Sequence, residues 1–129
     1  MKYRFLIFIA ILFGCSETES ITKQIPLEGK WVEVNTQTDT LTFGDFEGQE
    51  LMNLGRGKEM SDGALIPKRR SGFYEYQLLG NDQISLHWVF SANSAFNNYY
   101  FKQSGDSLLL ENFYDNFTSS SLLTFKKIN

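Results

Sequence analysis

The residues best suited to chemistry are the single cysteine, Cys15, and the single histidine, His87. One histidine excludes a multi-histidine metal site, and no further cysteine is available to complete a zinc site. A Ser-His-Asp triad around His87 would need a recognisable nucleophile, and the chain has no Gly-x-Ser-x-Gly sequence. We therefore predict no catalytic residue, no metal site and no cofactor. His87 is interpreted as a histidine on a strand surface, with Ser85 and Val89 on the same face.

Cys15 directly follows a segment with the composition of an export signal. Lys2 and Arg4 precede an unbroken apolar run at residues 5–13, which is too short to span a bilayer. Residues 12–15, Leu-Phe-Gly-Cys, resemble the lipobox of bacterial lipoproteins. The resemblance implies cleavage after residue 14 and attachment of lipid, including palmitate-type acyl chains, to the Cys15 sulfur. The alternatives are a plain signal peptide or a short anchor with an unmodified thiol.

Residues 15–26 form a polar segment that suits a tether between the lipid and a folded domain. Two or more acyl chains hold a protein firmly on a membrane, whereas a single chain binds only marginally. The absence of aspartate directly after Cys15 resembles the pattern of outer-membrane lipoproteins. Glu17 and Glu19 resemble the acidic export signal of Bacteroidota lipoproteins, with a solvated linker as the alternative. We expect an outer-membrane, lipid-anchored protein, facing either the periplasm or the cell surface.

Composition favours a single all-β domain at residues 27–129. Removal of the predicted signal at residues 1–14 leaves 115 of the 129 residues and changes the formal net charge from −3 to −5. This balance argues against nucleic-acid binding. Aromatic residues make up 16% of the chain, and only two prolines interrupt it. Aromatic residues are common in strands, and one core of modest size is expected.

Alternating apolar residues and turn dipeptides predict about eight strands in simple succession. The first three are expected at residues 30–36, 40–46 and 49–54, and the last at 121–128. In the first of them, Val32 and Val34 alternate with polar residues. Gly80-Asn81 and Gly105-Asp106 each join two apolar segments, and both dipeptides suit tight hairpins. No amphipathic helix is apparent, so we predict an antiparallel up-and-down meander closed into a small barrel.

The Gly29-x-Trp31 sequence at the head of the first predicted strand resembles the first-strand signature of lipocalins and of smaller lipocalin-like bacterial lipoproteins. The resemblance implies that Trp31 closes one end of the barrel. By analogy, Lys126 or Lys127 in the last strand would lie against its ring. The chain is shorter than a typical lipocalin. An eight-stranded barrel can be filled by side chains or can hold one small ligand, and the sequence leaves both alternatives open.

Two sets of residues are candidates for binding. The aromatic set either fills the barrel core or lines a cavity for an apolar ligand; as a cavity it comprises Trp31, Tyr74, Tyr76, Trp88, Tyr99 and Phe101. Phe90 is placed on the same face as Trp88. The basic set lies in residues 55–72, which show no clear period and are expected to form a long loop; it comprises Arg56, Lys58, Lys68, Arg69 and Arg70. This segment is either an anion-binding or membrane-surface patch, or a solvated hairpin connection.

The leading hypothesis is a membrane-anchored, non-enzymatic lipocalin-like domain that binds a small hydrophobic or amphipathic ligand at the cell envelope. The alternative is a filled barrel that acts as an interaction module. Its loops, including residues 97–100, would then contact an envelope protein or an anionic surface. The identity of the ligand and the oligomeric state do not follow from the sequence.

Overall fold

The computed structural model describes residues 26–115 and 121–128. The predicted signal, Cys15 and the predicted tether up to residue 25 lie outside the described residues. The strands of the described part are β1 (Gly29–Glu33), β2 (Thr40–Phe46), β3 (Gln49–Gly55), β4 (Lys58–Ser61), β5 (Ala64–Pro67), β6 (Gly72–Leu79), β7 (Gln83–Trp88), β8 (Asn97–Ser104), β9 (Ser107–Glu111) and β10 (Leu122–Ile128).

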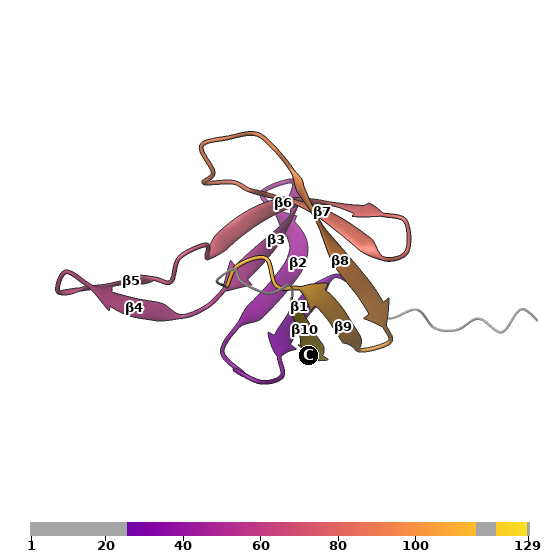
Figure 1. The fold of residues 1–129 in the computed structure, drawn as a ribbon, viewed down its shortest axis with the longest axis horizontal. Helices are drawn as coiled ribbons and strands as arrows, with labels where there is room; N and C mark the ends of the chain where they lie inside the picture. Colours follow the sequence, from indigo (N-terminus) through magenta and orange to yellow (C-terminus); the bar gives the residue numbers. More distant parts are fainter. Residues whose placement is uncertain (1–25, 116–120, 129) are drawn as a thin grey trace, which may run out of the picture.

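Eight of these strands form a closed antiparallel barrel in the order β1-β10-β9-β8-β7-β6-β3-β2 (Figure 1). Closure occurs at β1, where Trp31 is paired with Leu41 of β2 on one side and with Lys127 of β10 on the other. The predicted all-β, up-and-down, lipocalin-like barrel is thereby confirmed. All eight strands lie within residues 26–128, and because the barrel is closed, none of its strands is an edge strand.

β4 and β5 form a separate two-stranded hairpin, here called the arm, between barrel strands β3 and β6. The long loop predicted at residues 55–72 was wrong, because residues 58–61 and 64–67 of this segment pair as two strands. Asp62 and Gly63 both have positive φ values, 48° and 80°, as a two-residue hairpin turn requires. Every residue of β4 and β5 is exposed, and the arm projects away from the barrel (Figure 1). Because neither face is buried, the apolar alternation that marks other strands is absent.

The first strand is shorter than the predicted residues 30–36 and ends at Glu33. Its buried face consists of Trp31 and Glu33, while Val32 is half-buried and Val34 is exposed. The strand ends because the Glu33 carboxylate accepts hydrogen bonds from the backbone N–H groups of Asn35 (3.1 Å) and Thr36 (2.6 Å). These bonds hold the chain in a turn after Glu33.

Trp31 is fully buried in the barrel core. Its indole N–H donates to the Leu27 carbonyl (2.8 Å), and the Lys127 ammonium lies 5.5 Å from the ring centroid. Gly29 has a φ of +120°, and a Cβ at this position would lie 3.0 Å from Cε of Lys127. The φ of +120° favours glycine at position 29, and a side chain there would also crowd Lys127 beside the Trp31 ring. Of the two lysines considered, Lys127 occupies this place.

Candidate functional site

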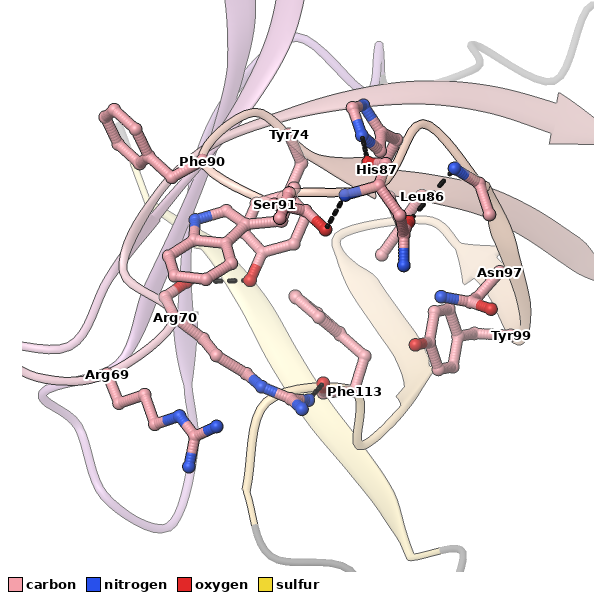
Figure 2. Close-up of a pocket in the computed structure, with 14 residues that line it drawn as sticks. Arg69, Arg70, Tyr74, Leu86, His87, Phe90, Ser91, Asn97, Tyr99 and Phe113 are labelled. Atoms are coloured by element: carbon pink, nitrogen blue, oxygen red, sulfur yellow. Dashed lines mark hydrogen bonds between the residues drawn. The ribbon is translucent and has the colours of Figure 1, made fainter.

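One end of the barrel, here called the mouth, is the end at which β7 and β9 finish and β6 and β8 begin. Because the strands are antiparallel, the start of β1 and the end of β10 lie at the opposite end of the barrel. Gly29 and Lys127 are therefore at that end, away from the mouth. A hollow of about 370 Å³ lies at the mouth. We call it the aromatic hollow; it is lined by Arg69, Arg70, Tyr74, Leu86, His87, Trp88, Phe90, Ser91, Ala92, Asn93, Ala95, Asn97, Tyr99 and Phe113 (Figure 2).

Aromatic rings packed edge to face form much of the hollow's wall. Tyr74 and Phe113 have ring centroids 5.1 Å apart, and Trp88 and Phe90 have centroids 6.0 Å apart, both in T-shaped contacts. Tyr99 packs against Phe113 at 5.8 Å. Tyr74 is 4% exposed, whereas Phe90 is 70% exposed at the rim. The hollow thus runs from a buried aromatic floor to an exposed apolar edge.

Residue 70 connects the two sides of the mouth. The Tyr74 hydroxyl donates to the Arg70 carbonyl (2.7 Å), and the Arg70 guanidinium donates to the Phe113 carbonyl (2.7 Å). Figure 2 shows the Arg70 side chain running toward Phe113. Burial raises the pKa of Tyr74 well above its ordinary value, although the nearby Arg70 charge opposes this. Tyr74 therefore remains a neutral hydrogen-bond donor throughout the physiological range.

The segment 89–96 forms another side of the hollow and is attached to β7 through His87. The Nε2 atom of His87 donates to the Asn93 carbonyl (2.7 Å), and its Nδ1 atom lies 3.6 Å from a Glu75 carboxylate oxygen. The Phe96 ring packs over the imidazole at 5.3 Å. His87 lies on β7, as the sequence predicted, and residues of this segment partly cover its ring. These contacts give the imidazole a role in positioning the segment.

The six aromatic residues proposed for a cavity fall into two groups in the structure. Tyr74, Trp88 and Tyr99 line the aromatic hollow. The other three do not line it: Trp31 and Phe101 are buried in the core, and Tyr76 packs against it with its ring 5.3 Å from that of Phe43. Phe90 does not continue the face of β7, because that strand ends at Trp88.

Sequence reasoning missed Phe113, which follows the end of β9 and contributes its ring and its carbonyl to the hollow. The sequence does contain a signal for it. Phe113 and Tyr114 are adjacent aromatic residues placed just beyond a strand, where solvated loop residues are the usual choice. Both side chains are buried against the barrel core.

Four of the five candidate basic residues meet at a second hollow of about 280 Å³, here called the basic hollow. It is lined by Arg56, Glu59, Lys68, Arg69, Arg70, Tyr114 and Asp115. Lys58, the fifth basic residue, is exposed on β4 and does not line it. The folding of residues 55–72 into the arm brings Arg56 beside Lys68 and Arg69, since the two ends of the arm lie together at its base.

Two buried acidic side chains support the mouth from inside. Glu33 caps the turn after β1, as described above, and Asp39 precedes β2. The Tyr114 hydroxyl donates to an Asp39 carboxylate oxygen (3.1 Å). Burial raises the pKa of Tyr114, and the Asp39 charge raises it further, so that the hydroxyl keeps its proton. The contact ties the segment after β9 to the start of β2.

Within residues 26–115 and 121–128, no three His, Cys, Asp or Glu side chains are grouped so that they could hold a metal ion. The same residues contain no helix with the length and hydropathy needed to cross a membrane.

Fold and site together define a small antiparallel barrel with an aromatic hollow at its mouth and a basic hollow beside it. No family model, curated protein or solved structure matches the chain.

Proposed function

We propose that this chain is a membrane-tethered, lipocalin-like barrel that binds a small hydrophobic or amphipathic molecule at the cell envelope. The aromatic hollow is the observation on which the proposal depends. Its volume of about 370 Å³ falls within the range of small-molecule sites, about 300–1,000 Å³. Such sites combine apolar walls with a few polar groups that orient the ligand, and the hollow contains both.

The apolar part of a ligand would lie against Trp88, Phe113 and the exposed Phe90. Trp88 has its indole N–H held by the Ser71 carbonyl (3.3 Å), so its ring is fixed as one wall. Tyr99 is half-buried at the edge of the hollow and offers a hydroxyl to a polar group. The aromatic rings would contact the apolar part of an amphipathic molecule, and polar side chains of the lining such as Arg69, Ser91 and Asn97 would contact its polar part.

The test is binding of a neutral apolar dye, N-phenyl-1-naphthylamine, to residues 16–129 purified without detergent. We expect dye fluorescence to rise on binding, and Trp88→Ala to weaken the affinity about tenfold, because one aromatic contact face is removed. Phe73→Ala is the matched control, since Phe73 lies on β6, packs against Phe46 and does not line the hollow. Equal affinity in wild type and Trp88→Ala, or no binding, would count against the proposal.

The tether is a separate part of the proposal and is supported by the sequence around Cys15. In a bacterial host, the full chain should incorporate labelled palmitate and partition into the detergent phase. The Cys15→Ser variant should lose the label, because the sulfur is the site of acylation. Labelling that persists in Cys15→Ser would refute lipidation at this residue, whatever the result of the dye experiment.

The arm supports a second candidate function, an interaction module. Met60 and Leu65 face each other across the hairpin and are 68% and 59% exposed. An isolated two-stranded hairpin is marginally stable in water, so a partner that covers this apolar pair would stabilise the arm. Failure of the dye to bind wild-type protein would favour this alternative.

A further inference from the structure

The aromatic hollow and the basic hollow adjoin, because Arg69 and Arg70 line both of them. Their volumes are about 370 and 280 Å³. A molecule that lies against the aromatic wall can therefore place one end beside the basic side chains. Figure 2 shows the Arg69 side chain to one side of the aromatic rings.

The basic hollow concentrates positive charge in a chain whose formal net charge is −3. Its lining has four basic side chains and two carboxylates, Glu59 and Asp115. With Asp115 in an ion pair with Arg56 (3.1 Å), Lys68 and Arg69 outnumber the one other carboxylate of the lining, Glu59. Local placement, rather than overall composition, thus produces a site that attracts anions.

Arg56 is held in place by its own contacts and acts as a support. Its guanidinium lies 4.8 Å from the centre of the Tyr114 ring, and it donates to the Arg69 carbonyl (3.0 Å) as well as to Asp115. These contacts fix the backbone at residue 69. Across the described residues, the side chains of Lys68 and Arg69 have no hydrogen bond or ion pair. They are therefore the groups available to a ligand.

We propose that the two hollows form one site for an amphipathic anion, whose apolar part contacts Trp88 and Phe113 and whose phosphate or carboxylate head contacts Lys68 and Arg69. The inference rests on the proposed ligand-binding function and specifies the chemical class of ligand. Charge-assisted hydrogen bonds to an anion are stronger than neutral ones, and arginine can form two in parallel. Arg56 already holds the backbone of Arg69, so the groups that must be ordered when the head group binds are the side chains of Lys68 and Arg69.

The test compares decyl phosphate, decanoate, 1-decanol and decyltrimethylammonium, each below its micelle concentration, with residues 16–129. Intrinsic fluorescence reports binding, because Trp88 lines the aromatic hollow whereas Trp31, the other tryptophan, is buried in the core. We expect decyl phosphate or decanoate to bind about tenfold or more tighter than 1-decanol, and the cation to bind no tighter than the alcohol. The Lys68→Ala/Arg69→Ala variant should abolish this preference while retaining affinity for 1-decanol.

The matched control is Lys30→Ala/Lys102→Ala, which removes the same charge from exposed positions outside both hollows. It should keep the preference for the anion. The inference is overturned if the preference survives in the Lys68/Arg69 variant, or if the control loses it equally. Inorganic phosphate that binds as tightly as decyl phosphate would also overturn it, since the site would then serve a free anion. If 1-decanol binds and the head group adds nothing, only this inference fails; if no probe binds, the proposed function fails as well.

Discussion

Replacement of Trp31 by alanine is expected to lower the free energy of unfolding by about 4 kcal/mol, as for other large aromatic residues in cores. The side chain is fully buried, so the substitution leaves a cavity that the closed barrel cannot easily fill. It also leaves the Leu27 carbonyl without the indole donor and removes the ring that lies beside the Lys127 ammonium. The lost packing is the largest of these contributions.

Urea unfolding at pH 7 measures this loss. Trp88→Ala serves as the control, because Trp88 is only partly buried at the mouth, and its loss of stability should be about half as large. A loss below about 1.5 kcal/mol for Trp31→Ala would contradict the assignment of Trp31 to a tightly packed core. The free energy of unfolding of Trp31→Phe should lie between those of Trp31→Ala and the wild type, since phenylalanine keeps much of the buried area.

Replacement of Glu33 by alanine is expected to cost about 2–3 kcal/mol at neutral pH, because two backbone N–H groups lose a charged acceptor. The pKa of Glu33 has two opposing influences. Burial raises it, but the backbone hydrogen bonds from Thr36 and Asn35 together outweigh burial, and the pKa is lowered from its ordinary value of 4.5. The folded state therefore favours the ionised carboxylate.

The sign of the pH dependence follows from this lowered pKa. A depressed pKa in the folded state contributes stability that is fully present above pH 4.5 and is lost as the pH falls through the folded value. The stability difference between wild type and Glu33→Ala should therefore be constant from pH 7 to about 5 and shrink below pH 4.5. Chemical denaturation of both proteins at a series of pH values from 7 to below 4.5 measures this stability difference.

Asp45→Ala is the matched control for Glu33→Ala, because Asp45 also accepts a backbone hydrogen bond, from Gly48 (2.7 Å), but at an exposed turn. Asp45→Ala should lower the free energy of unfolding by less than about 1 kcal/mol. A difference for Glu33→Ala that grows at acidic pH would show that the carboxylate is not stabilised in its ionised form.

The barrel could be predicted because its determinants are local. Alternating apolar residues and the Gly80-Asn81 and Gly105-Asp106 turns specify hairpins that each pair with their neighbours, so the order of strands follows the order of the chain. The arm could not be predicted from periodicity, because β4 and β5 bury neither face. Its Asp62-Gly63 turn was the available signal, and the lack of alternation around it obscured the hairpin.

The site could be predicted only in part. Alternate residues of a strand point to the same face of the sheet, and this alternation predicts that Tyr74, Trp88 and Tyr99 lie on the inner face of the barrel. All three line the aromatic hollow. The same alternation places Trp31 and Phe101 on that face. Whether an inward side chain lines the hollow or fills the core depends on its height along the barrel, and that height is set by strand tilt and stagger. Phe113 lies beyond the end of β9, where no periodicity applies.

The base of the arm has a consequence for how such proteins can diversify. The Lys68 backbone N–H donates to the Gly57 carbonyl (3.1 Å), so the chain leaves the barrel and returns to it at almost the same point. The pairs between β3 and β6, from Met52 with Tyr74 to Leu54 with Gly72, all lie outside residues 57–68. Evolution or an engineer can lengthen, shorten or exchange this insertion while the barrel keeps its register, so the arm is a natural position for grafting new recognition sequences.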